Sequence, residues 1–150
     1  DVVGADEWDA CAGADNPFVR HTFLSILEES GCASGEQGWL PQHLLLRNPD
    51  GLLVGCAPMY MKSHSQGEYV FDHGWANALE RAGRRYYPKL QIAVPFTPAT
   101  GPRLLVRDGQ DVDLTRRMLL QGAIQAAQQL KVSGIHITFP TGAEADVAKD

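Results

Sequence analysis

Residues 62–75 gather side chains that could carry out chemistry. The candidates in this segment are Lys62, His64, Ser65, Glu68, Tyr69, Asp72, His73 and Trp75. Acyl or aminoacyl transfer needs a base that removes a proton from the attacking amine, and Glu68 or Asp72 with His64 could provide it. The candidate catalytic residues are therefore Glu68, His64 and Asp72. The candidate substrate-binding residues of this segment are Lys62, Ser65, Tyr69 and Trp75. The alternative interpretation is a solvated loop whose aromatic side chains pack on a sheet.

Two histidines and a carboxylate in the same segment also raise the question of a metal site. His64, Asp72 and His73 are residue types that bind metals, but their spacing matches no established ligand pattern. We therefore predict no metal site. The sequence also lacks SxxK, GxSxG, HExxH and Walker motifs, so it gives no support to a hydrolase or an NTPase.

A second segment, residues 86–101, combines hydroxyl and aromatic groups with a stiffened backbone. Its candidate substrate-binding residues are Tyr86, Tyr87, Lys89, Thr97, Thr100 and Gly101. Pro95, Pro98 and Pro102 restrict the chain, which lowers the entropy lost when a ligand binds. Such a loop could hold a carboxylate or a sugar. Equally, the two tyrosines could be core anchors whose hydroxyl groups reach solvent.

The first elements that position these segments are a helix and a hairpin. Asn16-Pro17 predicts the start of a helix, because Asn accepts backbone N–H groups at an N-cap and Pro suits the first helical position. Residues 43–47 and 52–61 are apolar runs on either side of Asn48-Pro49-Asp50-Gly51, which predicts a β-hairpin. Pro58 within the second run predicts a bulge or an edge position.

Shorter elements follow in the middle of the chain. Residues 69–71 could form a short extended piece, and residues 75–83 predict a short helix that ends at a glycine. Residues 90–94 are a short apolar run. These elements bracket the two candidate segments.

The C-terminal third predicts a strand, a long helix and a strand. The strands are residues 103–106 and 135–139, and the helix is residues 113–131. The apolar face of this helix is predicted to comprise Leu114, Met118, Leu119, Ala123, Ile124, Ala127 and Leu130. Such a βαβ unit has parallel strands joined by a right-handed crossover. Thr141-Gly-Ala-Glu144 then matches a capping box and predicts a further helix.

Single residues outside the two segments carry simpler interpretations. His136 alternates with Ile135 and Ile137, so we interpret it as an outward-facing strand residue rather than a catalyst. The remaining large apolar residues assigned to the core are Trp8, Trp39, Met59 and Met118.

Length and composition bound the class of protein. The chain has 150 residues, with 44% hydrophobic and 21% charged residues, as expected of one globular domain. Its net charge of −5 argues against a DNA-binding protein. No apolar run is long enough to span a bilayer. The odd, widely spaced Cys11, Cys32 and Cys56 indicate reduced thiols, and we expect a cytoplasmic protein.

Several segments resemble one family of proteins. They are Asn16-Pro17-Phe18, residues 27–31 (LEESG), residues 38–44 (GWLPQHL), residues 62–72 (KSHSQGEYVFD), Trp75-Ala76, residues 86–90 (YYPKL) and residues 95–101 (PFTPATG). Together they resemble the bacterial FemAB-like proteins, which are labelled GNAT N-acetyltransferases or peptidoglycan biosynthesis/recognition proteins. The resemblance covers nearly the whole chain.

The resemblance implies a fold and an activity. The fold is α+β and GNAT-like, with an antiparallel hairpin joined to a parallel βαβ unit and helices packed on a central mixed sheet. The implied activity is acyl or aminoacyl transfer to peptidoglycan precursors. The precursor and an acyl or aminoacyl donor are then the expected partners.

The resemblance also implies that the 150 residues are one GNAT-like domain, the N-terminal half of a longer protein built from two such halves. This half alone is then expected to be inactive, and its further partner is either the missing C-terminal half or a second copy in a homodimer. The alternatives are a non-catalytic module that recognises a cell-wall peptide or a partner protein, and a half-domain that dimerises to complete its sheet.

One departure from the resemblance concerns the cofactor. GNAT proteins hold the acetyl-CoA pyrophosphate on a glycine-rich loop before a helix. The corresponding junction here, residues 107–113 (RDGQDVD), has a single glycine and three carboxylates. Carboxylates repel a phosphate, so we do not expect an acetyl-CoA site at this junction, and the cofactor is left unassigned.

Overall fold

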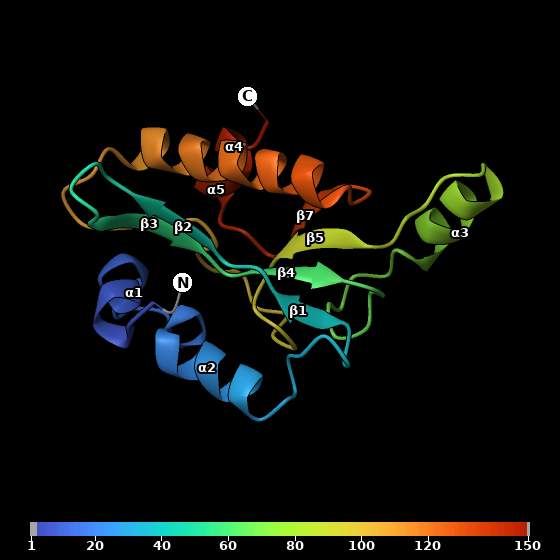
Figure 1. Ribbon diagram of the computed structural model, residues 1–150, viewed down its shortest axis with the longest axis horizontal. Helices are drawn as coiled ribbons and strands as arrows, with labels where there is room; N and C mark the ends of the chain where they lie inside the picture. Colours follow the sequence, from blue (N-terminus) through green and yellow to red (C-terminus); the bar gives the residue numbers. More distant parts are fainter. Residues whose placement is uncertain (1–2, 150) are drawn as a thin grey trace.

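The computed structural model describes residues 3–149 as two small sheets between layers of helices (Figure 1). The helices are α1 (Ala5–Ala12), a 3-10 helix (Pro17–Val19), α2 (His21–Glu29), α3 (His73–Arg81), α4 (Val112–Leu130) and α5 (Gly142–Val147). The strands are β1 (Trp39–Pro41), β2 (Leu44–Arg47), β3 (Leu53–Ala57), β4 (Met59–Lys62), β5 (Lys89–Ile92), β6 (Leu105–Val106) and β7 (Ile135–Ile137). This α+β content confirms the predicted fold class.

A proline divides the strands between the two sheets. The four-stranded sheet has the order β1-β4-β5-β7 and the three-stranded sheet has the order β2-β3-β6. The predicted hairpin is confirmed, because β2 pairs antiparallel with β3 and places Leu44 opposite Ala57. The predicted second strand of the hairpin is interrupted at Pro58, which has no N–H to donate. One half of it, β3, therefore pairs in one sheet and the other half, β4, in the other.

The parallel pairing differs from the one predicted. Residues 103–106 contain β6, which pairs antiparallel with β3 instead of joining β7. The parallel neighbour of β7 is β5, with Leu90 opposite Ile135, so the parallel unit is β5–α4–β7. The prolines between β5 and β6 turn the chain from one sheet to the other, and this turn separates β6 from β7.

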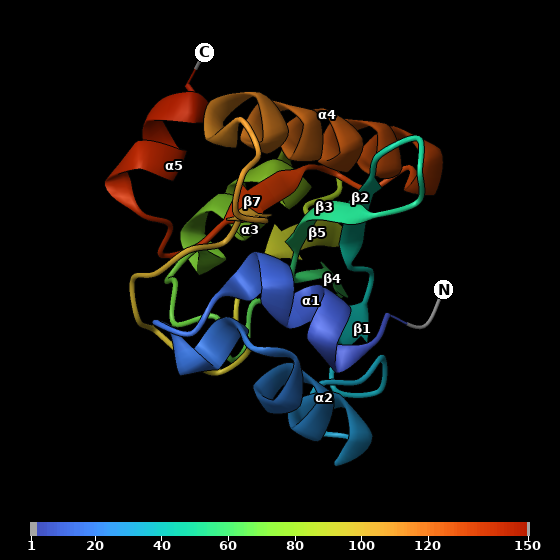
Figure 2. The same ribbon diagram turned by 90° about the vertical axis from the view of Figure 1, so that its left-hand side faces the viewer.

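Helices cover the sheets from two sides. Figures 1 and 2 show α4 and α5 on one side of the strands and α1 and α2 on the other. Under α4, Leu119 and Ala123 pack with Met59, Leu90 and Ile92. On the opposite side, the core cluster consists of Trp8, Cys11, Val19, Leu24, Leu53, Cys56, Val94 and Leu105.

Only one row of α4 is buried. Thr115, Leu119 and Ala123, spaced four residues apart, face the sheets and are buried. The rest of the predicted apolar face is largely outside the core, and Leu114, Met118, Ile124 and Leu130 are exposed. The prediction that Met118 lies in the core is therefore wrong, whereas Trp8, Trp39 and Met59 are buried as predicted. Because α4 packs on the sheets from one side only, the stripe that it buries is narrower than the apolar face predicted from its sequence.

The remaining helices match the sequence signals to different degrees. Asn16 accepts the N–H of Phe18 and caps the 3-10 helix, and a break at Arg20 separates this turn from α2. The capping box of Thr141 and Glu144 is confirmed at the start of α5. Residues 69–71 form no strand. The sequence interpretation missed α1 altogether.

A substitution at Gly55 tests the packing of α4 on β3. A Cβ at Gly55 would lie 2.8 Å from the Thr115 Cγ2 atom and 3.3 Å from the Leu105 carbonyl oxygen. We expect Gly55→Ala to lower the free energy of unfolding by about 1–3 kcal/mol, because it overpacks this contact. Urea denaturation measures the change. Gly134→Ala is the matched control, since a Cβ there meets no atom within 4 Å. Equal losses in the two variants would contradict this packing.

Candidate functional site

The four-stranded sheet has one polar face. The register pairs Trp39 with Lys62 and Lys62 with Lys89. It also pairs Tyr60 with Gln91 and Gln91 with His136. Directly paired residues point to the same side of a sheet, so these side chains share one face. The other face carries the apolar side chains that pack under α4. The strand alternation therefore places two lysines on the side away from α4.

Lys89 lies at the centre of a buried hydrogen-bonded cluster. We call this the Lys89 cluster; it comprises Ser65, Glu68, Asp72, Tyr86, Tyr87 and Lys89. The Lys89 Nζ atom lies 2.9 Å from Glu68 Oε2, 3.0 Å from Asp72 Oδ2 and 3.1 Å from Ser65 Oγ. One ammonium group thus holds two carboxylates and a hydroxyl group that lie between β4 and α3 in the sequence. The two candidate segments meet at this point.

Two tyrosines complete the Lys89 cluster. The Tyr86 hydroxyl group donates to Asp72 Oδ2 at 2.5 Å. The Ser65 hydroxyl group donates to the same oxygen at 3.0 Å, and its Oγ lies 2.6 Å from the Tyr87 hydroxyl oxygen. The sequence left open whether the two tyrosines bind a ligand or anchor the core with their hydroxyl groups in solvent. Both hydroxyl groups form hydrogen bonds within the Lys89 cluster, which argues against the second interpretation.

The Lys89 cluster is closed to solvent but not fully satisfied. The side chains of Lys89 and Glu68 are 0% exposed, and that of Asp72 is 8% exposed. Within the described residues, Glu68 Oε1, Asp72 Oδ1 and the neighbouring Gln91 Oε1 have no hydrogen-bond donor. A buried acceptor without a donor costs free energy. The cluster therefore has unused capacity to accept hydrogen bonds.

The two carboxylates have pKa values shifted in opposite directions. Burial alone would raise the pKa of Asp72, but hydrogen bonds from Tyr86, Lys89 and Ser65 outweigh it and lower the pKa to about 2. Burial raises the pKa of Glu68, and the bond from Lys89 offsets only part of this effect. Asp72 is thus a fixed negative charge, whereas Glu68 is the carboxylate that takes up a proton more readily.

These shifts have opposite consequences for stability. The depressed pKa of Asp72 contributes stability above its ordinary pKa, and this contribution is lost as the pH falls toward about 2. The raised pKa of Glu68 works in the other direction, because the folded chain holds a proton that the unfolded chain has released. Part of the stability gained at Asp72 is therefore lost at Glu68 as the pH rises above the ordinary carboxylate range.

Lys62 lies beside the Lys89 cluster but has other partners. Its Nζ atom lies 3.5 Å from the centroid of the Trp39 ring and donates to the Gln66 carbonyl oxygen at 3.2 Å. Burial lowers the pKa of Lys62 to about 7. A neutral amine is therefore accessible at Lys62 near physiological pH, although no bond to Glu68 or Asp72 is formed.

His64 faces away from the carboxylates. Its Nδ1 atom accepts the N–H of Gln66 at 3.1 Å, and its ring lies against Gly38. Gly38 has a φ of 73°, and a Cβ there would lie 2.3 Å from His64 Nε2, so only glycine fits. Burial lowers the pKa of His64. The structure thus brings Glu68 and Asp72 together but not His64 with either of them.

The other predicted binding residues lie outside the cluster. Tyr69 and Trp75 are exposed to solvent. The Thr97 hydroxyl group donates to the Pro95 carbonyl oxygen, and Thr100 is exposed. Gly101 donates its N–H to the Phe139 carbonyl oxygen.

Two residues near the site were not chosen from the sequence. Gln91 is buried and donates to the Thr138 hydroxyl oxygen at 3.1 Å. His136 is half-buried, and its ring centroid lies 5.6 Å from that of Tyr86. Burial lowers the pKa of His136, and the charge of Lys89 adds to this effect. His136 therefore packs against the cluster rather than facing solvent. The pairing of β7 with β5 places Gln91 and His136 on the same face of the sheet as Lys89, and this pairing could have identified both residues.

The junction before α4 does not suit a pyrophosphate. The Asp111 side chain accepts the N–H of Leu114 at 3.0 Å, so the chain's own carboxylate occupies the helix N-terminus. Asp113 adds a second carboxylate in the first turn. Arg107 points away and donates to the Leu53 carbonyl oxygen. These residues do not fit the phosphates of acetyl-CoA at this junction.

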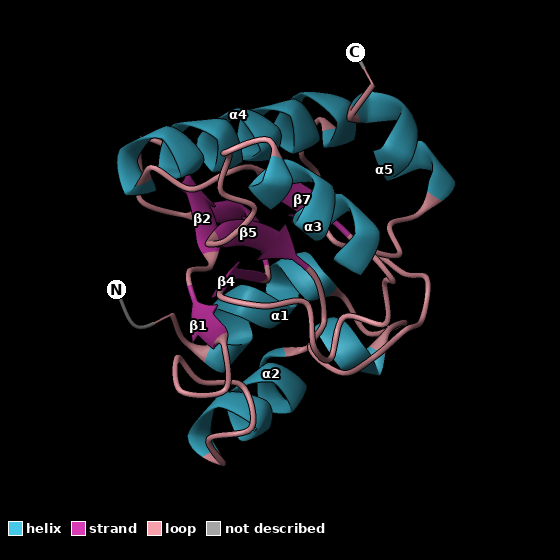
Figure 3. Cartoon of the chain, turned by 90° about the vertical axis from the view of Figure 1, so that its right-hand side faces the viewer, coloured by secondary structure: helices cyan, strands magenta, loops and turns pink. Residues whose placement is uncertain are grey.

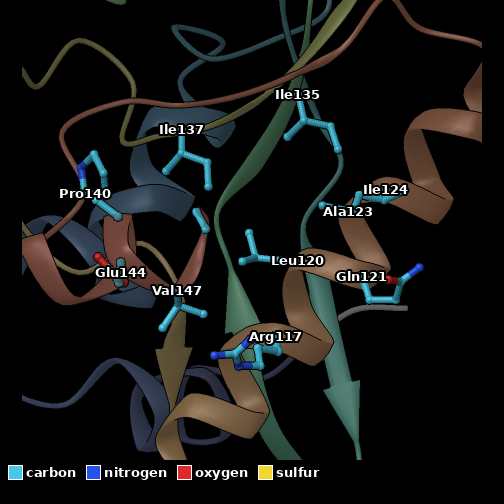
Figure 4. A pocket seen from close by; sticks show the side chains of 12 residues that line it. Arg117, Leu120, Gln121, Ala123, Ile124, Ile135, Ile137, Pro140, Glu144 and Val147 are labelled. Carbon is cyan, nitrogen blue, oxygen red and sulfur yellow. The ribbon is translucent and has the colours of Figure 1, made fainter. Parts of the chain in front are cut away.

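A groove of about 640 Å³ lies on the other face of the four-stranded sheet (Figure 4). It is bounded by α4, β7 and α5 and is lined mainly by apolar residues. These include Leu120, Ile124, Ile135, Ile137, Pro140 and Val147. At one end, Glu144 Oε1 accepts the N–H groups of Arg103 and Leu104, each at 2.7 Å. The groove runs beside the outer edge of β7, the last strand of its sheet.

A family model for peptidoglycan biosynthesis/recognition, FemAB-like, matches residues 1–150. The chain belongs to the FemAB-like family. No curated protein and no solved structure matches it significantly. Membership in the FemAB-like family places the chain in peptidoglycan biosynthesis or recognition.

Two further properties bear on this FemAB-like protein. Across residues 3–149, no three or more His, Cys, Asp or Glu side chains are arranged to hold a metal ion. None of the helices in the same range is long and apolar enough to cross a membrane.

Removing the central cation tests the Lys89 cluster. We expect Lys89→Met to lower the free energy of unfolding at neutral pH by about 3–5 kcal/mol, because it leaves two buried carboxylates without a cation. The loss should shrink as the pH is lowered, since protonation neutralises both groups. Urea denaturation between pH 4 and 8 measures both effects.

A second variant separates charge from packing. Lys89→Met combined with Glu68→Gln should recover part of the lost stability, because only one uncompensated carboxylate remains. An equal loss in the single and double variants, with no dependence on pH, would show that Lys89 acts through packing alone.

Proposed function

We propose that this FemAB-like chain is the GNAT-like N-terminal half of an acyl- or aminoacyltransferase that modifies peptidoglycan precursors. The observation that carries the proposal is the pair of carboxylates at Lys89, whose pKa values are shifted in opposite directions. Two titratable groups separated in this way are typical of sites that combine a base with a fixed charge. The unpaired oxygens of Glu68 and Asp72 would accept hydrogen bonds from the amine of an acceptor peptide.

The roles in the reaction follow from these shifts. The acceptor amine attacks the carbonyl carbon of the donor, the bond from that carbon to the leaving oxygen or sulfur breaks, and the amine loses a proton. Glu68 is the base that takes this proton, since burial raises its pKa. Asp72 stays ionised and orients the acceptor, with Lys89 holding both carboxylates in place.

Access to Glu68 requires the covering segment to move. Glu68 and Asp72 lie inside, whereas the side chains of Gln66 and of residues 69–71 are exposed. We therefore infer that the acceptor enters by displacing the exposed side chains of Gln66 and of residues 69–71. The remaining predicted binding residues, Lys62, Tyr69, Trp75, Thr97, Thr100 and Gly101, would contact the substrate outside the cluster.

We also place the reaction in the cytoplasm. All three cysteines are free, with Cys11 and Cys56 buried and Cys32 exposed. Unpaired cysteines are in keeping with a reducing compartment.

A rate measurement on Glu68→Gln tests the proposed transfer. The full-length protein, with both proposed halves, is incubated with aminoacyl-tRNA or acyl-CoA as donor and a UDP-linked muramyl pentapeptide as acceptor, and the product is followed by mass spectrometry. We expect Glu68→Gln to slow transfer by about 100-fold or more, because the amide cannot accept the proton. Glu36→Gln, at an exposed position in another loop, is the control and should keep the wild-type rate. No product with any donor, or equal rates in both variants, would refute the proposal.

The groove beside β7 favours a second candidate function, recognition of a cell-wall peptide without catalysis. The bonds to β5 include the Gly134 carbonyl oxygen and the Thr138 N–H. Because strand groups alternate, the N–H and C=O groups of Ile135 and Ile137 face the open edge. An extended peptide could pair with this edge and place apolar side chains in the groove.

Peptide binding to two variants of α4 tests this second function. A stem pentapeptide of peptidoglycan is titrated into the protein by calorimetry. We expect Ile124→Lys to weaken binding by about tenfold, because Ile124 lines the groove. Leu114→Lys is the control, since Leu114 is exposed on the same helix but does not line the groove. Unchanged affinity in Ile124→Lys would exclude the groove as the peptide site.

A further inference from the structure

An arm between β4 and β5 stands apart from the rest of the molecule. We call residues 69–85 the aromatic arm; it contains α3. Figure 1 shows α3 at one end, away from both sheets, and Figure 3 looks onto that end. The groove does not explain why the chain extends here, and the proposed transfer uses only Tyr69, Asp72 and Trp75 of these residues.

The aromatic arm exposes its large apolar side chains. Phe71 is 92% exposed, Trp75 is 73% exposed and Tyr69 is 56% exposed. Ala76 is the buried residue of α3, so the helix turns a small side chain toward the body and Trp75 outward. Exposed aromatic residues gathered in one place mark an interaction site, because their exposure to water is unfavourable.

The same arm carries positive charge on an otherwise acidic chain. Arg81, Arg84 and Arg85 are exposed, and Glu80 is the exposed carboxylate among residues 73–85. Within the described residues, none of the three arginines forms an ion pair. The whole chain has a net charge of −5. The charge is therefore strongly asymmetric, with the basic end at the arm.

We propose that the aromatic arm docks on the surface of an anionic lipid bilayer. Trp, Tyr and Phe side chains favour the interfacial layer of a membrane, where the rings lie among the headgroups. The arginines of the same arm attract anionic headgroups. The acidic body is repelled by the same surface, so charge complementarity orients the molecule with the arm toward the bilayer. A short projecting arm also suits insertion between headgroups better than it suits the large, flat area of a stable protein interface.

The fluorescence of Trp75 reports docking directly. The chain has three tryptophans, and Trp8 and Trp39 are only 2% and 1% exposed. A change of solvent environment on docking therefore affects Trp75. We expect a saturable blue shift with vesicles of equal parts phosphatidylglycerol and phosphatidylcholine, and little change with phosphatidylcholine alone. Glycerol phosphate in solution should leave the emission unchanged, which distinguishes a lipid surface from a free phosphate.

Charge-reversal variants test the location of the surface. Arg84→Glu should weaken binding to the anionic vesicles by about fivefold or more, since each basic residue near the surface contributes to binding. Lys149→Glu changes the net charge equally at an exposed site outside the arm, and its binding should stay close to wild type. Equal losses in both variants would show that net charge alone governs binding and would overturn the proposal.

An apolar variant separates a bilayer from a protein partner. Phe71→Ser should weaken vesicle binding, whereas Leu114→Ser, at an exposed leucine of α4, should not. Light scattering is run on both variants. If Phe71→Ser leaves vesicle binding intact but changes the oligomeric state, the arm is a protein interface and the proposal fails. Vesicle binding is measured without donor or acceptor, so its outcome does not depend on the proposed transfer.

Discussion

The buried ammonium group of Lys89 is the constraint on which the candidate site depends. A lysine on the inner face of a sheet is stable as a cation only if acceptors surround it. Glu68, Asp72 and Ser65 meet this need within 3.1 Å. They come from the segment that follows β4, so the charge on β5 determines where that segment must lie. Residues 65–72 therefore provide the oxygen atoms that take the place of water around the Lys89 ammonium group.

The polar site exists because the four-stranded sheet has two unlike faces. One face packs its apolar side chains under α4, and the opposite face carries Lys62, Lys89 and Gln91. The interruption at Pro58 separates this sheet from the three-stranded one, on which α1 packs. Without that interruption, β3 and β4 would form one long strand of one sheet. On the polar face, Tyr60 donates to Glu28 of α2 at 2.8 Å, so α2 covers one part of this face and residues 65–72 cover another.

The sequence allowed prediction of those parts of the fold that depend on local signals. The hairpin turn, the caps at Asn16 and Thr141 and the long helix rest on interactions between residues close in the chain, and all are present. The partner of β7 could not be predicted, because it depends on which of two preceding strands lies nearer in space. The narrow buried stripe of α4 also could not be predicted, because the apolar pattern of a helix does not show on how many sides other elements cover it.

In the candidate site, too, local signals could be predicted from the sequence and tertiary contacts could not. Glu68 and Asp72 could be chosen because polar and titratable side chains gather in residues 62–75, but their convergence on Lys89 depends on the register of β4 and β5. His64 could not be excluded from the carboxylates by sequence, because the close approach of its ring to Gly38 is a tertiary contact. Gln91 and His136 were not chosen as site residues. Strand alternation indicates which face of the sheet they occupy, but it does not indicate which residues cover that face.

The inner and outer sides of residues 65–75 are coupled by the chain itself. Glu68 and Asp72 point inward to Lys89, while Tyr69, Phe71 and Trp75 between and beside them point outward. Three residues separate the two carboxylates, so a displacement of Tyr69 or Phe71 by several ångströms must also move at least one of them. Any contact made by the outer aromatic side chains therefore acts on the hydrogen bonds at Lys89. The unpaired oxygens of Glu68 and Asp72 become accessible by the same movement. A segment that holds a charge on one side and exposes aromatic rings on the other can thus transmit a surface contact to a buried carboxylate.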